Sequence, residues 1–356
     1  MIRCGALGLA AGLACGALGL AGALACGERA TVHEGEHVTL TIDPAVEPCG
    51  DMVGHMDRVV ATLADYLGVS LAGEQFNFVW FSEERFAAEA NCGVSAGTCE
   101  GGGWIRSTAA PADPTLVRLV LALVGSPPPF FALGAWIAFM PNADSFEGAG
   151  PSGGDVQQML ALGYVDYALA GGFTRFLIDR HGLDAYLTFY ASIGEEDPLP
   201  VIEAAHAEHF GESLTETIVA FDAGRRSCPT PRFNLKLFEC SAPPIAWDGD
   251  SLLLRRSLTC GEDDVVGPFS DHTARIFSTL EVATEGYFEI GLASDEPVGM
   301  TFGGCGGCED ETDAWLAAGR EPERRWLPAG RYYLNIFGDV DAASALALRI
   351  ERVDEP

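Results

Sequence analysis

The character of this chain changes once along its length, near residue 227. Residues 114–224 follow helical periodicity almost throughout, interrupted by turn residues at 126–129, 141–154, 171–172, 181–182 and 194–198. Beyond residue 227 the pattern changes to short alternating runs separated by turn residues, at 252–258, 274–282, 287–292, 331–337 and 344–350. A helical region followed by a β region predicts two domains of different class.

The segment before the helical region predicts a small sheet. Residues 37–43 and 75–81 alternate like strands, and residues 56–69 between them place apolar side chains at helical spacing. Strand, helix and strand followed by helices indicate an α+β fold. We therefore expect an α+β domain at residues 26–226, with a small sheet and then a helical bundle, and an all-β sandwich domain at residues 227–356.

Residues 1–25 have the composition of a signal peptide. Arg3 precedes an apolar run rich in Ala, Leu and Gly, and small residues flank the expected cut before Cys26. The ending LAGALAC resembles the bacterial lipobox, with Ala23 and Leu24 in inverted order, and this resemblance implies lipidation of Cys26. Simple cleavage after Ala25 and a membrane span are the alternatives. We expect an outer-membrane or cell-surface lipoprotein that contacts the membrane only through its lipid, or a periplasmic or secreted protein.

The cysteine count agrees with export. Of eleven cysteines, Cys4 and Cys15 leave with the signal and Cys26 would carry lipid, so eight remain and all can pair. The short loop between Cys92 and Cys99 would cost little to close. The CxxC spacing at residues 305–308 favours a structural disulfide over a redox or zinc motif, because no second CxxC accompanies it. The eight disulfide candidates are Cys49, Cys92, Cys99, Cys228, Cys240, Cys260, Cys305 and Cys308.

The formal charge of −30, from 51 acidic and 21 basic residues, excludes nucleic acid as a partner. The acidic residues are spread along the chain, which favours a solvated surface over a specific cation-binding surface. Some pairs lie in expected turns without the spacing of a calcium loop, so we expect solvated turns there too. These pairs are Asp248/Asp250, Asp263/Asp264 and Asp339/Asp341.

Two helical segments carry a family resemblance. The sequence AGGFTRFLIDRHGLDAYLTFY at residues 170–190 predicts a helix, a glycine break and a helix, and FGESLTETIVAF at residues 210–221 predicts a further helix. Together with the preceding elements, residues 38–221 resemble the gluzincin-type metallopeptidase-like domains of exported bacterial proteins. The resemblance implies a zincin-like fold, in which one helix bears HExxH and the next bears a glutamate ligand.

The positions that correspond to the zinc ligands and the catalytic glutamate of this family are apolar or basic. The FALG sequence at residues 131–134 resembles the second zinc helix, with Leu133 at the glutamate position. This register places Val117 and Leu121 at the two histidines and Arg118 at the catalytic glutamate. Zinc catalysis needs imidazole and carboxylate ligands and a carboxylate base, which these side chains cannot supply. The resemblance thus implies a degenerate site with no catalytic residue and no cofactor. Two ordinary core helices without enzyme ancestry would give the same pattern.

Two other groups contain histidines at metal-ligand spacing. His33 and His37 fit the letters of HExxH, but a central glycine and the alternation that follows predict a strand, on which they would stand about 13 Å apart. Glu203, His206 and His209 share one face of a predicted helix, where a solvated surface is favoured over a peripheral metal site. We therefore expect neither group to form the zinc site of a peptidase.

The C-terminal region carries a second resemblance. Residues 327–338, LPAGRYYLNIFG, resemble a signature strand of the pre-peptidase C-terminal-like β-sandwich domains of secreted bacterial peptidases, and residues 280–292, with a turn at 284–286, resemble their preceding hairpin. Such domains are associated with secretion and with attachment to a surface or substrate. A sandwich with no ligand is the alternative.

These observations predict a non-catalytic exported surface or periplasmic protein, built on a degenerate zinc-peptidase scaffold. Its role would be binding or scaffolding, with an unknown peptide, protein or envelope component as partner. The alternatives are an active zinc metallopeptidase with displaced ligands and a structural envelope protein.

Overall fold

The structure is a computed structural model. The predicted signal peptide, Cys26, Cys92, Cys228, Cys308 and the predicted domain boundary near residue 227 lie outside the residues that it describes. The described residues are 30–43, 45, 47–89, 98–101, 103–108, 110–111, 113–139, 153–163, 165–223, 237–269, 272–305, 314–342 and 344–355.

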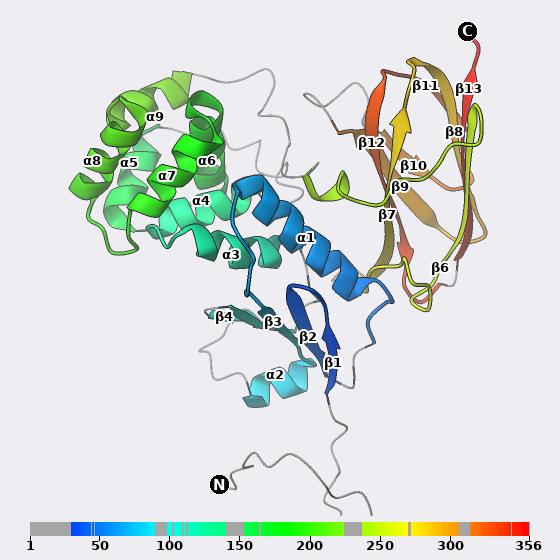
Figure 1. Ribbon diagram of the computed structural model, residues 1–356, viewed down its shortest axis with the longest axis horizontal. Coiled ribbons are helices and arrows are strands. Elements are labelled where there is room, and N and C mark those ends of the chain that lie inside the picture. Colours follow the sequence, from blue (N-terminus) through cyan, green and yellow to red (C-terminus); the bar gives the residue numbers. More distant parts are fainter. Residues whose placement is uncertain are drawn as a thin grey trace, which may run out of the picture.

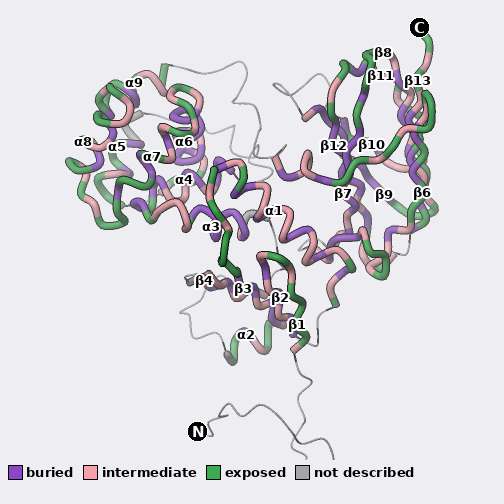
Figure 2. The backbone as a smooth tube through the Cα atoms, in the orientation of Figure 1, coloured by how far each residue is buried: buried purple, intermediate pink, exposed green. Residues whose placement is uncertain are grey.

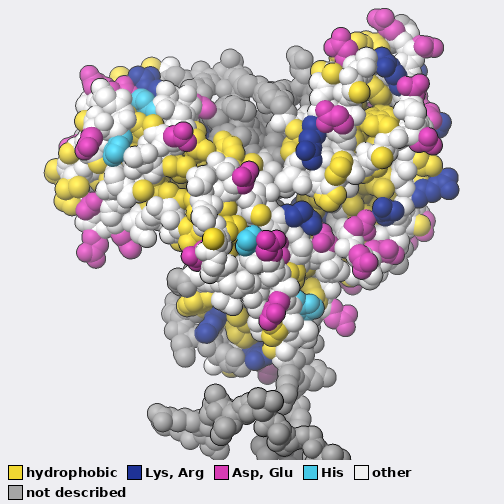
Figure 3. Space-filling view, viewed as in Figure 1, with side chains coloured by type: hydrophobic (Ala, Val, Ile, Leu, Met, Phe, Trp, Pro, Cys, Tyr) yellow, Lys and Arg dark blue, Asp and Glu magenta, His cyan; other side chains and the backbone are white. Residues whose placement is uncertain are grey.

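Helices and sheets occupy separate parts of the molecule. In Figure 1 α1 (Met52–Leu67) lies near the centre, with a small sheet below it, the other long helices to the left and a sandwich to the right. Figure 3 shows acidic side chains scattered over the visible face, without one dominant patch. The α+β class expected from the sequence is confirmed.

The small sheet has the order β1-β2-β3-β5-β4. Its three inner strands are parallel, and both edge strands are antiparallel to their neighbours. Because parallel neighbours need a crossover, α1 connects β2 to β3 and buries its apolar face on the sheet. The strands are β1 (Thr31–Glu34), β2 (Val38–Ile42), β3 (Phe76–Trp80), β4 (Thr98–Gly101) and β5 (Trp104–Ser107), and the short α2 (Glu83–Glu89) follows β3.

The described residues between 113 and 223 form helices and no strand, as predicted. The predicted breaks at 126–129, 181–182 and 194–198 separate consecutive helices, and the break at 141–154 falls largely outside the described residues. The helices are α3 (Asp113–Val124), α4 (Pro129–Phe139), α5 (Gly153–Leu162), α6 (Tyr167–His181), α7 (Leu183–Ser192), α8 (Leu199–Phe210) and α9 (Leu214–Ala223).

The predicted break at residues 171–172 is wrong, because α6 continues through both glycines. Gly171 faces Ile137 of α4 so closely that a Cβ there would overlap the Ile137 side chain. On α4, a Cβ at Gly134 would lie 2.5 Å from Thr174 Oγ1 and 2.7 Å from the Ala170 carbonyl oxygen. The glycines let α4 and α6 pack closely, and this contact outweighs their low helix propensity.

The C-terminal part is a sandwich of two four-stranded antiparallel sheets, ordered β10-β9-β12-β7 and β11-β8-β13-β6. Figure 2 shows buried residues where the sheets face each other. All five predicted strands are present, whereas β9, β10 and β11 were missed because β9 is glycine-rich and the other two are short. The strands are β6 (Ser251–Leu258), β7 (Thr273–Val282), β8 (Gly286–Ser294), β9 (Val298–Gly304), β10 (Ala314–Ala317), β11 (Glu323–Leu327), β12 (Gly330–Asp339) and β13 (Ser344–Val353).

The predicted hairpin at residues 280–292 is wrong. Its two strands, β7 and β8, belong to different sheets and do not pair with each other. The residues between them lead from one sheet to the other, and packed sheets are only about 10 Å apart. Leu280 and Ile290 thus enter the same core from opposite sides.

Disulfides join parts of the chain that are distant in sequence. Cys49, before α1, is bonded to Cys260 of the sandwich, and Cys240 is bonded to Cys305. Cys99 is also disulfide-bonded. The Cys240 bond shows that Cys305 is not half of a CxxC dithiol. Disulfides persist in oxidising compartments, which indicates an extracytoplasmic location. Within the described part of the chain, no helix combines the length and apolar character needed to cross a bilayer.

Candidate functional site

A pocket of about 360 Å³ opens where α3, the start of α4 and the end of α7 meet. We call it the helical pocket. Most of its lining is alkyl side chains and small residues, with one guanidinium, one phenol and one carboxylate. The lining residues are Arg118, Leu121, Ala122, Gly125, Ser126, Pro127, Pro129, Ala132, Leu133, Tyr190 and Glu195.

The turn between α3 and α4 shapes the rim of the helical pocket. Pro129 occupies the start of α4, where its missing N–H needs no helical partner. The carbonyl of Pro128 accepts from the backbone N–H of Phe131 at 2.9 Å and of Ala132 at 3.1 Å. A Cβ at Gly125 would lie 3.1 Å from the Cα of Ala191, so glycine lets the end of α7 come close to this turn.

Arg118 and Tyr190 supply polar atoms to the helical pocket. The Arg118 guanidinium carbon lies 4.8 Å from the Trp136 ring centroid, a cation–π distance. Tyr190 is 3% exposed, and burial raises the pKa of its phenol despite the opposing charge of Arg118. Tyr190 therefore remains a neutral hydroxyl at physiological pH. Glu195 lies exposed in the loop after α7.

Three of the four positions predicted to replace peptidase chemistry meet here. Arg118, Leu121 and Leu133 line the helical pocket, whereas Val117 is fully buried in the core. The lining residues include a single carboxylate and no histidine or cysteine. Alkyl groups cannot coordinate a metal, and a guanidinium cannot act as a base at neutral pH. The arrangement can accept apolar groups and donate hydrogen bonds to an acceptor.

The literal HExxH forms the turn of a β-hairpin. His33 lies on β1 opposite Leu40, and His37 lies just before β2. The Asp57 carboxylate of α1 holds this turn by accepting from the backbone N–H of residues 36, 37 and 38 at 2.6, 2.9 and 2.9 Å. The strand predicted for this motif is confirmed only at His33 and Glu34, because residues 35–37 form the turn, and no part of the motif is helical.

The second histidine group does not form the expected solvated surface. His206 is fully buried, and its Nδ1 lies 3.1 Å from the Glu212 carbonyl oxygen. Because a carbonyl only accepts, Nδ1 carries the hydrogen, and Nε2 is buried without a hydrogen-bond partner. Burial lowers the pKa of His206 to about 4. The expectation was wrong for His206 because Phe189 and Phe210 cover this face of α8, with ring centroids 5.8 and 4.7 Å from the imidazole.

The other two members of that group do not complete a metal site. Glu203 is partly buried, and the ring centroid of His209 lies 6.4 Å from that of Phe189. Among the residues that the structure describes, no three His, Cys, Asp or Glu side chains gather closely enough to hold a metal ion. Of the acidic turn pairs, Asp264 pairs with Arg256 at 2.9 Å, and the Asp339 carboxylate accepts from the Asp341 N–H at 2.9 Å.

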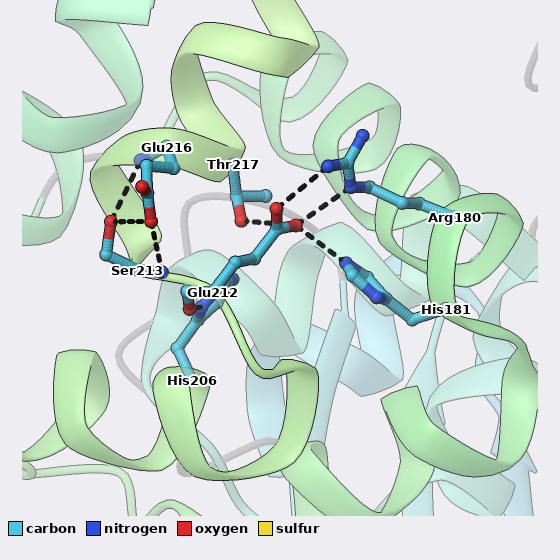
Figure 4. Close-up of polar contacts among 7 residues, drawn as sticks. All are labelled: Arg180, His181, His206, Glu212, Ser213, Glu216 and Thr217. Carbon is cyan, nitrogen blue, oxygen red and sulfur yellow. Dashed lines mark hydrogen bonds and ion pairs between the residues drawn. The ribbon is translucent and has the colours of Figure 1, made fainter.

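Next to His206, the Glu212 carboxylate organises a polar cluster that the sequence analysis missed (Figure 4). Arg180 donates to it from Nε and Nη2, both at 2.8 Å, and Thr217 donates at 3.0 Å. His181 Nε2 lies 3.1 Å from the same carboxylate. The Arg180 hydrogen bonds are the main cause of a lowered Glu212 pKa. We call these residues, with His206, the Glu212 cluster.

One signal in the sequence pointed to this cluster. Ser213 and Glu216 have the S-x-x-E spacing of a helix capping box. In the structure Ser213 donates to Glu216 from its N–H at 2.9 Å and its hydroxyl at 2.7 Å, which fixes the start of α9. The Glu212 cluster therefore joins the ends of α6 and α8 to the start of α9.

No protein-family model matches the chain, and no curated protein sequence matches it. The chain is similar to the solved pre-peptidase C-terminal domain of collagenase from Bacillus anthracis, with 17% identity over 31% of this chain and 94% of that one and a TM-score of 0.23. It is similar to Legionella pneumophila aminopeptidase A in complex with aspartic acid, with 10% identity, a TM-score of 0.32 and 84% of this chain covered. In that pairing the chain spans 35% of the aminopeptidase. A third structure, hydroxypropylphosphonic acid epoxidase from S. wedmorenis, has 14% identity, covers 51% of this chain and 96% of that one, and has a TM-score of 0.13.

Proposed function

We propose that this chain is a non-catalytic exported binding protein, anchored by a lipid on Cys26, whose helical pocket accepts an apolar side chain of a peptide segment. The observation that carries the proposal is the lining of the pocket. Leu121 and Leu133 stand where the peptidase-like register expects ligands, and the volume of about 360 Å³ is that of a small ligand site. This scaffold would retain a pocket and lose the means to activate water.

The polar groups suit a peptide backbone. The Arg118 guanidinium can donate to a backbone carbonyl or carboxylate, and the neutral Tyr190 hydroxyl can donate or accept. The apolar walls supply the transfer free energy for one side chain, about 1.5–3 kcal/mol. Such a site would bind a short segment weakly and with preference for an apolar residue.

Filling the helical pocket tests its role. Peptides would be selected from a random dodecamer phage library on the mature protein and then titrated by calorimetry. Ala122→Trp places an indole in the pocket and should weaken binding at least tenfold. Ala204→Trp, at an exposed position of α8, is the matched control and should leave the affinity unchanged. Equal affinities in the native protein and both variants would place the peptide site elsewhere.

Measurements of bound metal and of peptidase activity test the proposal that the protein is not catalytic. Purified mature protein should contain less than one-tenth equivalent of zinc by elemental analysis and should show no chelator-sensitive peptidase activity. One tightly bound zinc, lost in the double variant His33→Ala/His37→Ala or His206→Ala/His209→Ala, would favour the alternative of displaced ligands. Mass spectrometry of the N-terminus tests the lipid on Cys26.

A further inference from the structure

The sandwich carries a second hollow, independent of the helical pocket. It has a volume of about 440 Å³ and lies at one end of the outer face of the β10-β9-β12-β7 sheet. We call it the sandwich groove. Its lining combines two aromatic rings, several small residues and polar side chains at the rim. The lining residues are His272, Thr273, Pro297, Val298, Gly299, Trp315, Ala317, Ala318, Phe337, Gly338 and Asp339.

Strand register explains why the sheet is hollow here. Ala317 of β10 pairs with Gly299 of β9, and Gly299 pairs with Phe337 of β12. Trp315 lies two residues before Ala317 on the same strand, so Trp315 and Phe337 lie diagonally across the outer face of the sheet, with the small Ala317 beside Trp315. Two strand spacings across the sheet and two residues along it separate their Cα positions by about 12 Å. The Phe337 ring also covers Gly299, since a Cβ there would lie 2.6 Å from Phe337 Cζ.

Trp315 presents an unusual amount of apolar surface. Its side chain is 51% exposed, although tryptophan normally buries most of its large area. Phe337 is partly buried and forms part of the floor beside it. A half-exposed indole beside the small Ala317 side chain is a flat apolar platform that a ring-shaped ligand can approach closely.

The rim adds hydrogen-bonding groups. Asp339 is exposed at the end of β12 opposite Thr273, and His272 directly precedes β7. His272 has a φ of 58°, a left-handed conformation uncommon for a non-glycine residue. Its N–H donates to the Phe269 carbonyl at 2.9 Å, and its own carbonyl accepts from Val340 at 3.0 Å. Strained backbone of this kind concentrates at ligand sites.

We propose that the sandwich groove binds one ring of a neutral carbohydrate chain. A pyranose has an apolar C–H face, which can stack on Trp315, and an equatorial girdle of hydroxyls, which can bond to the Asp339 carboxylate and the His272 imidazole. The groove volume is within the range of small-ligand sites. An uncharged ligand also avoids repulsion by the charge of −30.

The same aromatic and acidic groups raise the question of a quaternary ammonium ligand, which tryptophan faces also attract. Two features favour the sugar. The Arg320 guanidinium carbon lies 5.4 Å from the Trp315 ring centroid, so a cationic ligand at this ring would meet a like charge, whereas a neutral ring would not. In addition, Cα positions about 12 Å apart place Trp315 and Phe337 too widely for a cage around one ammonium group.

Titration with defined saccharides tests the proposal. The mature protein would be titrated by calorimetry with cellohexaose, xylohexaose, mannohexaose and chitohexaose. At least one should bind, and Trp315→Ala should weaken that binding at least tenfold, while Trp315→Phe should retain part of it. Trp326→Ala is the matched control, because Trp326 is 47% exposed on the opposite sheet, and it should bind like the native protein.

Four results would overturn the proposal. These are no binding of any of the four saccharides, equal losses in the Trp315 and Trp326 variants, binding of tetramethylammonium in place of sugar, and a Trp315-dependent dimer in sedimentation. The helical-pocket variant Ala122→Trp should bind sugar normally, so failure of this proposal and failure of the peptide-binding proposal are distinguishable.

Discussion

Helix α6 is held to its neighbours by two contacts of opposite character. Its middle packs on α4 through Gly134 and Gly171, with no charge involved. Its last turn enters the Glu212 cluster through Arg180 and His181, where the contact consists of hydrogen bonds and opposite charges. The first contact depends on shape and the second on protonation.

This difference predicts how each contact fails. Added volume at a glycine contact must displace backbone or branched side chains, and close-packed interiors resist such shifts. In the Glu212 cluster the partly exposed carboxylate has room to adjust, but removing its charge or adding a proton weakens its ion pair with the exposed Arg180 and its hydrogen bond with the buried Thr217. The α4–α6 contact should therefore be sensitive to side-chain size, and the Glu212 cluster to pH.

The largest effect is expected at the glycine contact. Gly134→Val should reduce the free energy of unfolding by about 3 kcal/mol, because its Cβ would meet the Ala170 carbonyl. Gly172→Ala is the matched control, since its Cβ would lie 3.7 Å from the Phe221 ring, an ordinary contact. That variant should stabilise α6 by about 0.5–1 kcal/mol. Urea denaturation measures both changes, and equal losses in both variants would show that the contact is not close.

The next largest effect is expected from pH. The pKa of His206 is lowered from 6.5 to about 4, so between these values the unfolded chain holds a proton that the folded chain lacks. The free energy of unfolding should therefore have its highest value from this group above pH 6.5 and should fall by about 3 kcal/mol as the pH decreases toward 4. Denaturation at stepped pH measures this slope. His206→Gln should flatten it, and an unchanged slope in that variant would assign it to other groups.

The Glu212 carboxylate contributes at lower pH. Its pKa is lowered from 4.5, so its stabilisation is present above pH 4.5 and is lost as the pH falls through the folded-state pKa. The window between pH 6.5 and 4.5 therefore reports mainly on His206, and further loss below pH 4.5 includes Glu212.

A smaller loss is expected from truncating the carboxylate at neutral pH. Glu212→Ala should reduce the free energy of unfolding by about 2 kcal/mol, because Arg180 and Thr217 lose their shared acceptor. Glu208→Ala, at an exposed position of α8, should change it by less than about 0.5 kcal/mol. Thermal denaturation distinguishes the two, and similar small changes would show that solvent replaces the carboxylate.

Much of the architecture followed from local pattern. Alternation at residues 37–43 and 75–81 and helical spacing at residues 56–69 gave β2, β3 and α1, because each element buries one face. The helix break predicted at residues 171–172 was wrong, since low helix propensity does not reveal that another helix packs against these glycines. The hairpin predicted at residues 280–292 was wrong for a related reason, because alternation identifies a strand but not the sheet to which the strand belongs.

The candidate sites were predictable in part. The chemistry of Arg118, Leu121 and Leu133 could be judged from residue type, and the structure places these three around one pocket. Tyr190 comes from more than fifty positions away, and no local signal connects it to them. The sandwich groove arises from a register between three strands, two of which the sequence analysis missed.

The sequence by itself determined the α+β class, the strands within residues 37–43 and 75–81 and the functional groups of Arg118, Leu121 and Leu133, because periodicity and residue type are local properties. Only the tertiary structure decided that α6 continues through its glycines, that His206 is buried, that Cys305 bonds to Cys240 and that two hollows exist. Those outcomes depend on which distant surfaces meet, and packing and long-range pairing select them among many combinations that the local pattern allows equally.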